Sequence, residues 1–205
     1  MNDYITILES GYAEYEDRKS VFYGFAFPVK TEAEALSHVA RLKKEYPDAR
    51  HHVYAYVLSE NSITRFTDDR EPQGTAGMPV LDAIRKNGCT DTLIVVIRYF
   101  GGVLLGTGGL VHAYSSAAVS ALKDGKIVRF SPYRFYKILA SYSDYQKILP
   151  SLSEYNFRIS DTVFLENVEI FASISSEGYE AAIDKITEIS SARVKIEFIE
   201  EKMSY

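Results

Sequence analysis

Two glycine-rich segments constrain the fold of this chain more than any other feature. Residues 68–79 read DDREPQGTAGMP, and residues 98–114 read RYFGGVLLGTGGLVHAY. Together they hold seven of the 12 glycines in the chain. Glycine is tolerated where a side chain would clash or where the backbone adopts a positive φ. The two segments therefore predict tight turns, or a backbone that closely approaches a neighbour or a ligand. We expect a functional site in these two segments.

The first 131 residues predict one domain of mixed α and β structure. Residues 93–97 are apolar at every position, which predicts a central strand covered on both faces. Thr31 with Glu34 forms a capping-box pattern, which predicts the start of a helix that ends near Pro47. The other expected elements are two strands within residues 4–29, a strand over 51–58, a loop over 61–77, a short helix over 79–87, a helix from about 108 and a strand over 127–130.

A second domain is expected to begin after Ser131-Pro132. The pattern beyond it is strand, helix, strand, strand, helix, strand, which is the order of a ferredoxin-like unit. Ser143 with Gln146 is a second capping-box pattern and predicts where the first of these helices starts. The expected strands are 135–141, 157–165, 168–174 and 194–198. The predicted domains are thus 1–131 and 132–205.

Composition excludes several classes of protein. No apolar run in the 205 residues approaches the roughly 20 needed to span a bilayer, so no membrane partner is expected. The N-terminus lacks the pattern of a signal peptide, and the single cysteine, Cys89, rules out an internal disulfide. A cytoplasmic location is therefore predicted. The net charge of −5 argues against a histone-type nucleic-acid binder but leaves a local basic groove open.

The second glycine segment has the pattern of an anion site. It joins a buried strand to a helix, and free N–H groups at such a helix start attract anions. One reading is that residues 106–109 cradle a phosphate-containing ligand, with Arg98 as counter-charge. The other is that the glycines only allow tight packing. No Gly-Lys-Ser/Thr is present, so the loop is not a P-loop, and Val111 replaces the third glycine of a dinucleotide fingerprint.

The acidic residues of the first segment also allow two readings. Asp68, Asp69 and Glu71 have the chemistry to hold a divalent ion or to act as acid and base. A solvated loop that caps the next turn through side-chain hydrogen bonds is the favoured alternative. Thr75, next to Gly74, has the chemistry of a nucleophile or phosphate ligand, although turn geometry explains it equally well. We predict no resident metal and no cofactor.

Three histidines lie in or near these segments. His51 and His52 are adjacent, so on a strand they point to opposite faces and cannot form one metal-binding pair. One of them is expected to line the site, and His52 is included among the site residues. His112 lies early in the helix after the glycine loop and is expected near the same site. Cys89 has no zinc-type spacing around it, and a Cys–His catalytic pair remains a minor alternative.

The two segments closely resemble the signature of the YigZ/IMPACT family. Residues 49–56 resemble a third block of that family, and residues 18–22 a weaker N-terminal one. Two departures stand out. Arg70 replaces the usual glycine, so the acidic turn is expected to be reshaped. His112 replaces the usual arginine, which would make anion binding weaker or dependent on pH.

The resemblance implies an α+β fold with two domains. The first would be an α/β sandwich like the second domain of ribosomal protein S-five. The second would be a ferredoxin-like βαββαβ domain, like the fifth domain of the elongation factor that drives translocation. Eukaryotic relatives regulate translation by competing for a partner of a starvation-activated kinase. The resemblance therefore implies a non-enzymatic regulator of translation that binds RNA, the ribosome or a translation-related protein.

Two other functions remain open on sequence alone. The first is an enzyme acting on a small phosphorylated or nucleotide substrate, with carboxylate-held Mg²⁺. The second is a protein–protein adaptor. Under any of these functions the same residues are expected to contact the ligand or partner. They are Asp68, Asp69, Glu71, Gly74, Thr75, Arg98, Tyr99, Gly101, Gly102, Gly106, Gly108, Gly109, His52 and His112.

Overall fold

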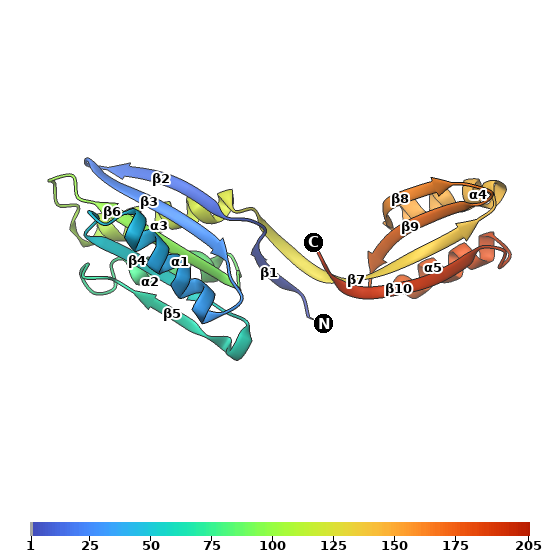
Figure 1. The fold of residues 1–205 in the computed structure, drawn as a ribbon, viewed down its shortest axis with the longest axis horizontal. Helices are drawn as coiled ribbons and strands as arrows, with labels where there is room; N and C mark the ends of the chain where they lie inside the picture. Colours follow the sequence, from blue (N-terminus) through green and yellow to red (C-terminus); the bar gives the residue numbers. More distant parts are fainter. Residues whose placement is uncertain (1) are drawn as a thin grey trace. The chain divides into compact units, whose positions relative to one another are not determined.

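The computed structural model of the protein describes residues 2–205, which divide into two compact units (Figure 1). Tyr4–Arg129 form the first unit, and Phe130–Tyr205 belong to the second. Each unit has its own hydrophobic core around one antiparallel sheet. The α+β class expected from the sequence is confirmed.

The first unit is built on a five-stranded sheet with β6 at its centre. Neighbouring strands are antiparallel in the order β2-β3-β6-β4-β5. The strands are β2 (Gly11–Asp17), β3 (Ser20–Pro28), β4 (His51–Val57), β5 (Thr64–Thr67) and β6 (Thr92–Tyr99). Every residue of β6 except its last is buried, which confirms the central strand predicted from residues 93–97.

Helices cover both faces of this sheet. α1 (Glu32–Glu45) covers the face on which Val95 and Ile97 of β6 lie. α2 (Gly77–Lys86) and α3 (Gly106–Asp124) cover the other, where Ile94 and Val96 pack against them. Each face of β6 thus contributes to a separate apolar core, which explains why its sequence does not alternate.

Small residues bring α3 unusually close to the sheet. A Cβ atom added to Gly24 of β3 would lie 2.5 Å from the carbonyl oxygen of Ala117, and one added to Gly11 of β2 would lie 2.1 Å from that of Ala121. No side chain fits at either strand position, so glycine is required there for steric reasons. The close approach packs the second half of α3 against β2 and β3.

Helix α1 starts as the sequence predicts. The hydroxyl of Thr31 accepts a hydrogen bond from the N–H of Glu34 at 3.2 Å. The Glu34 carboxylate returns to the N–H of Lys30, one residue before the helix cap, at 2.8 Å. Both bonds satisfy donors that the helix start would otherwise leave free.

Two strands differ from the sequence prediction. β5 lies within residues 61–77, which were expected to form a loop, and follows a short 3-10 turn, η1 (Glu60–Ser62). It is an edge strand that pairs with β4, and none of its four residues is buried, so it lacks the apolar pattern that reveals a strand. β7 (Ile127–Ala140) is a single strand through Pro132, where two strands were expected. The ladder of β7 with β9 starts at Tyr133, so the missing N–H of Pro132 does not interrupt it.

The second unit has the ferredoxin-like order of elements that the sequence predicts. After β7 come α4 (Tyr142–Glu154), β8 (Arg158–Phe164), β9 (Val168–Ser175), α5 (Tyr179–Ile189) and β10 (Lys195–Ser204). The strands pair antiparallel in the order β10-β7-β9-β8. β7 also pairs with β1 (Tyr4–Ile7). Both helices pack on the same face of this sheet, through residues such as Ile148 and Ile186.

The cap of α4 is not the one expected. Ser141, rather than Ser143, occupies the N-cap, and its hydroxyl accepts from the N–H of Asp144 at 3.1 Å. The Asp144 carboxylate in turn accepts from the Ser141 hydroxyl at 2.9 Å. A buried aspartate that also binds Arg193 therefore selects the start of the helix, and Ser143 is left in its first turn.

The helices of the described part of the chain are all too short or too polar to cross a lipid bilayer.

Candidate functional site

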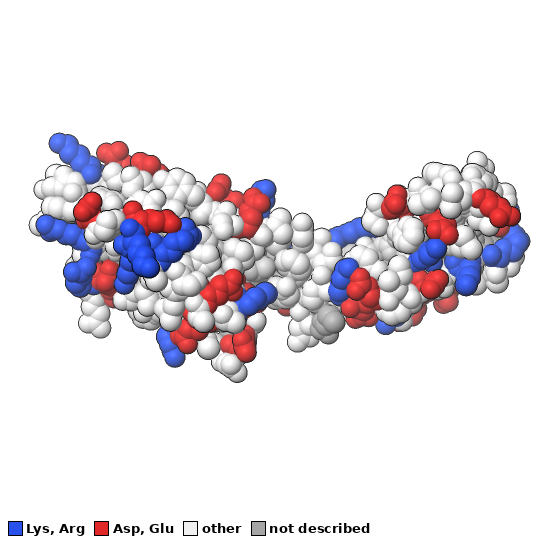
Figure 2. All heavy atoms as spheres, viewed as in Figure 1, with Lys and Arg blue, Asp and Glu red and all other residues white. Residues whose placement is uncertain are grey.

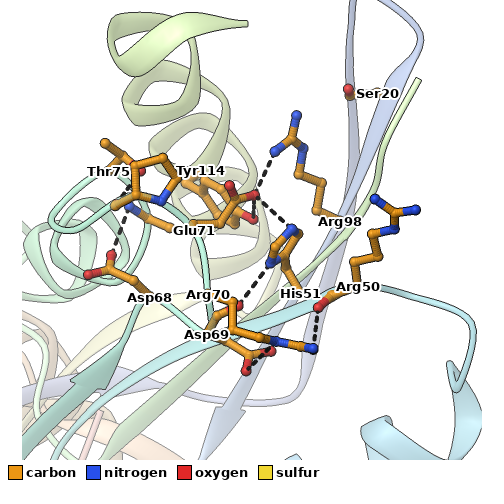
Figure 3. Close-up of polar contacts among 12 residues, drawn as sticks. Ser20, Arg50, His51, Asp68, Asp69, Arg70, Glu71, Thr75, Arg98 and Tyr114 are labelled. Carbon is orange, nitrogen blue, oxygen red and sulfur yellow. Dashed lines mark hydrogen bonds and ion pairs between the residues drawn. The ribbon is translucent and has the colours of Figure 1, made fainter. Parts of the chain in front are cut away.

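Asp68 holds the acidic turn against the start of α2. Its carboxylate accepts hydrogen bonds from three backbone N–H groups, those of Gly74 at 2.9 Å, Ala76 at 3.1 Å and Gly77 at 2.8 Å (Figure 3). Three donors on one carboxylate leave little capacity for a metal ion. The capping role, which was the favoured reading of this residue, is the one that the structure shows.

The next two residues form a strained turn. Asp69 and Arg70 both have positive φ, 41° and 72°. This is the left-handed region that glycine adopts without steric cost. Arg70 therefore takes the conformation that a glycine would take, and its guanidinium donates to the carbonyl of Arg50 at 2.7 Å. Asp69 ties the turn to β4, because its carboxylate accepts from the N–H of His52 at 2.6 Å.

Glu71 is the centre of a buried polar cluster. Its Oε1 accepts from Nη1 of Arg98 at 2.6 Å and from the hydroxyl of Tyr114 at 2.8 Å, and lies 3.7 Å from Nε2 of His51. Figure 3 shows these side chains converging from the acidic turn, β6, α3 and β4. Burial, reinforced by the neighbouring Glu71 carboxylate, raises the pKa of Tyr114 far above its usual range, so the phenol stays protonated and acts as a donor.

The two adjacent histidines point to opposite sides, as expected. His51 faces the cluster, and its Nδ1 donates to the carbonyl of Asp69 at 2.8 Å. His52 is buried on the side of α1, where its Nε2 donates to the carbonyl of Tyr46 at 3.1 Å. Burial lowers the pKa of His52. His51, and not the His52 included in the expected site, is therefore the histidine beside Arg98.

Three further expected site residues lie apart from the cluster. Tyr99 follows Arg98 on β6 and so faces the other side, where it packs edge-on against Tyr23 at 5.9 Å between ring centroids. His112 is exposed on α3 and packs against the ring of Tyr15 at 6.0 Å. Thr75 donates to the carbonyl of Pro72 at 2.6 Å, which is the turn role already considered for it.

The loop from β6 to α3 rests on the turn between β2 and β3. A Cβ atom on Gly101 would lie 2.0 Å from the backbone carbonyl carbon of Lys19, and the N–H of Gly101 donates to the hydroxyl of Ser20 at 3.1 Å. Gly102 and Gly106 have positive φ, 84° and 73°. These three glycines thus allow a tight loop, while Gly108 and Gly109 lie within the first turn of α3.

A shallow hollow opens beside this loop. It has a volume of about 200 Å³ and is lined by Arg50, His51, Arg98, Phe100 and Leu104. Phe100 is 44% exposed and Leu104 is 81% exposed. Nε of Arg98 is buried and makes no hydrogen bond among the residues that the structure describes. Arg98 therefore has donor capacity beyond its ion pair with Glu71.

Two arginines line the hollow, and two more bond the backbone of residues that line it. Arg50 and Arg98 are the lining arginines. Arg18, in the β2–β3 turn, donates to the carbonyl of Leu104 at 3.4 Å, and Arg70 donates to the backbone carbonyl of Arg50 at 2.7 Å. Figure 2 shows Lys and Arg side chains at the end of the first unit where the β2–β3 turn and the β6–α3 loop lie in Figure 1. A local basic rim thus exists in an acidic chain.

The helix that starts next to this rim has no side-chain cap. Leu105 occupies the N-cap position of α3, and a leucine side chain cannot accept a hydrogen bond. The first turn of α3 contains Gly106, Gly108 and Gly109, and no atom comes within 4 Å of the Cβ position of Gly108. Gly106 and Gly108 are exposed and carry no side chain that would cover the N–H groups of this turn, as an anion-binding helix start requires.

The arrangement of the carboxylates at this site does not support binding of a metal ion. In residues 2–205, no three His, Cys, Asp or Glu side chains group as a metal site would need. Asp68 is occupied by backbone donors and Glu71 by Arg98 and Tyr114. What the site offers chemically is positive charge, backbone donors and an exposed apolar loop, which together suit binding of an anion.

Comparison with known proteins identifies the family. The family described as Impact N-terminal domain matches residues 18–122, and the domain of unknown function DUF1949 matches residues 138–193. The IMPACT family member YvyE of Bacillus subtilis (strain 168) is 34% identical over 96% of this chain and 91% of that protein. The chain belongs to the IMPACT family. The family predicted from the glycine segments is confirmed.

Other relatives show how far the likeness extends. An IMPACT family member of Haemophilus influenzae is 33% identical over 98% of both chains. Protein IMPACT of Bos taurus is 31% identical over 105 residues, which are 49% of this chain and 33% of that protein. A crystal structure of a hypothetical protein superposes with a TM-score of 0.60 at 28% identity over 98% of both chains. The bacterial relatives thus share both units of this IMPACT family member.

Several residues at the hollow and its cluster in this IMPACT family member were absent from the predicted site, among them Arg18, Arg50, His51, Phe100, Leu104 and Tyr114. Tyr114 lies on the buried face of α3, and the hydroxyl of a buried tyrosine needs a partner, which was a usable signal. Arg50 and Arg18 lie in segments that resemble family blocks, but nothing in their local pattern places them near Arg98. The pairing of β4 with β6, which sets His51 opposite Arg98, brings Arg50 there, and the pairing of β3 with β6 brings the turn that carries Arg18.

Proposed function

We propose that this IMPACT family member is a non-enzymatic RNA-binding protein of the translation apparatus, and that its first unit contacts the phosphate backbone of ribosomal RNA. The observation that carries the proposal is that Arg50 and Arg98 line the hollow beside the uncapped start of α3, while Arg18 and Arg70 bond the backbone of two other positions of its lining, Leu104 and Arg50. Arginine side chains and free helix N–H groups are the donors that phosphate oxygens accept from.

The engagement of the carboxylates supports binding over catalysis. An enzyme with Mg²⁺ would need Asp68 or Glu71 free to hold the ion, and both already accept hydrogen bonds from internal donors. Glu71 also partly neutralises Arg98, so the exposed arginines around it carry most of the positive charge. This arrangement favours an extended polyanion over a small phosphorylated substrate enclosed in a pocket.

A salt titration of binding to ribosomes and to labelled RNA tests this proposal. The logarithm of the binding constant should fall linearly with the logarithm of salt concentration. Arg50→Gln and Arg18→Gln should each reduce that slope by about 1, because each removes roughly one phosphate contact. Arg65→Gln is the matched control, since Arg65 is exposed on β5 and does not line the hollow.

Gly108→Asp provides a second test at the start of α3. The change places a negative charge next to the N–H groups that we assign to phosphate, at a position with space for a side chain. RNA binding should be lost while the thermal unfolding midpoint stays within a few degrees. Wild-type protein that fails to bind RNA and ribosomes at low salt would refute the proposal and leave a protein partner as the next candidate.

A further inference from the structure

One face of the sheet in the second unit is not covered by α4 or α5. The helices α4 and α5 pack on the face that carries Tyr136, Ile138 and Ile170. Because side chains alternate along a strand, the residues between these point to the opposite face. That face has a shallow hollow of about 120 Å³ between β7 and β10, lined by Lys137, Leu139, Lys195 and Glu197. Among the described residues of this unit, strands β10, β7, β9 and β8 form this face, and both helices lie on the other one.

Three aromatic rings lie on this open face, and each has a cation over it. The guanidinium of Arg158 lies 4.1 Å from the ring centroid of Tyr133, Nζ of Lys202 lies 4.4 Å from that of Phe135, and Nζ of Lys137 lies 5.6 Å from that of Phe171. All three rings are half-buried. A ring beside a cation combines a stacking surface for a base with a donor for its phosphate.

The rings occupy the two central strands. Tyr133 and Phe135 are two residues apart on β7, a separation of about 7 Å along a strand. Phe171 lies on β9, opposite Lys137 in the ladder, and so is the diagonal neighbour of Phe135. Aromatic residues on the central strands of a four-stranded sheet are the arrangement by which such sheets stack two or three unpaired bases.

Acidic neighbours on this face hold the cations only weakly. Lys137 pairs with Glu169 at 2.9 Å, and Lys202 pairs with Glu200. The Lys202 and Glu200 side chains are 53% and 48% exposed, and exposed ion pairs contribute little to stability; Lys137 and Glu169 are 33% and 25% exposed, so solvent still partly screens their pair. The two lysines can therefore leave their partners and rings to contact phosphates, which uncovers the rings for stacking.

From this geometry we infer that the open sheet face of the second unit binds single-stranded RNA by stacking bases on Tyr133, Phe135 and Phe171. Lys137, Arg158 and Lys202 supply the phosphate contacts. The inference rests on the proposed function only for the class of ligand, because it concerns another unit and another kind of contact. A duplex does not fit this role, since its bases are already stacked on one another and their faces are not accessible.

The test compares binding of a labelled oligouridine of about ten nucleotides with binding of a duplex RNA of the same length. Phe135→Leu and Phe171→Leu keep the apolar volume and remove the ring. Each should weaken oligouridine binding by about tenfold and leave duplex binding unchanged. Tyr142→Leu is the matched control, because Tyr142 is 50% exposed on α4, which covers the opposite face. Thermal unfolding of each variant checks that it is folded.

The outcomes separate this inference from the proposed function. Loss of oligouridine binding in the two phenylalanine variants but not in Tyr142→Leu supports stacking on the sheet. If only Arg50→Gln and Arg18→Gln weaken binding, the sheet inference is overturned and the proposed function stands. If only the phenylalanine variants weaken it, the site in the first unit is overturned and the sheet face stands. Wild-type protein that binds neither RNA overturns both.

Discussion

Arg98 and Glu71 form a buried ion pair that joins the central strand of the first unit to the acidic turn. Nη1 of Arg98 lies 2.6 Å from Oε1 of Glu71, and their side chains are only 7% and 4% exposed. The same oxygen accepts from Tyr114 of α3. One carboxylate therefore connects the turn, the sheet and a helix, and it also limits how much of the Arg98 charge is available to a ligand.

Replacing this carboxylate should destabilise the protein strongly. Glu71→Gln keeps the size of the side chain but leaves the Arg98 cation buried without a counter-charge, which should lower the free energy of unfolding by about 3 kcal/mol. Urea denaturation measures this. Glu45→Gln, which removes an exposed i,i+4 pair with Arg41, should change it by less than about 0.5 kcal/mol. Equal effects of the two substitutions would contradict the buried pair.

Asp68 should behave as a structural cap and not as a metal ligand. Asp68→Ala removes an acceptor shared by three backbone N–H groups, so it should cost about 2 kcal/mol of stability. Millimolar Mg²⁺ should leave the melting temperature of the wild-type protein unchanged in a thermal-shift assay. A rise in melting temperature with Mg²⁺ that Asp68→Ala abolishes would instead identify a metal site.

Substitution by alanine should have opposite effects on stability at Gly101, in the β6–α3 loop, and at Gly108, in the first turn of α3. Gly101→Ala places a Cβ atom 2.0 Å from the Lys19 backbone, which cannot yield without moving the β2–β3 turn, so the variant should be severely destabilised. Gly108→Ala meets no atom within 4 Å and lies in a helix. It should be neutral or stabilising by up to about 1 kcal/mol. The thermal unfolding midpoints of both variants test this. Similar midpoints for the two variants would show that Gly101 is not in tight contact with the Lys19 backbone.

Asp144 should make the stability of the second unit depend on pH at the acid end. Hydrogen bonds from Arg193 and Ser141 lower the pKa of this carboxyl to about 2. A carboxyl with a lowered folded-state pKa contributes its stability above the unfolded-state value near 3.9, and the contribution is lost as pH falls through about 2.

Arg193→Gln isolates this effect. The free energy of unfolding should differ between wild type and variant at pH 5 to 7, and the difference should shrink as the pH falls from about 4 towards 2. Denaturant titrations at each pH measure it. Lys185→Gln, which removes an exposed pair with Glu188, serves as control and should show no such trend. If the difference in free energy of unfolding between wild type and Arg193→Gln stays constant with pH, Asp144 is excluded as its cause.

Most of the fold could be predicted from the sequence because the patterns that define its helices and strands are local. The apolar run at residues 93–97 identified the central strand, the Thr31 and Glu34 pattern identified the start of α1, and the order of elements after β7 identified the ferredoxin-like unit. β5 and the cap of α4 were the exceptions. β5 is a strand only through its pairing with β4, and Ser141 caps α4 with an aspartate that a distant arginine holds in place.

The candidate site could not be assembled in the same way. The sequence by itself determined that the two glycine segments carry the family signature and that His51 and His52 face apart. Only the tertiary structure decided that Asp68 caps a helix, that Glu71 is buried against Arg98, and that Arg50 and Arg98 line one hollow. The physical reason is that the role of a charged group depends on its burial and its partners. Here those partners lie 27 and 43 residues away from Glu71 along the chain, and antiparallel pairing and the packing of α3 bring them together.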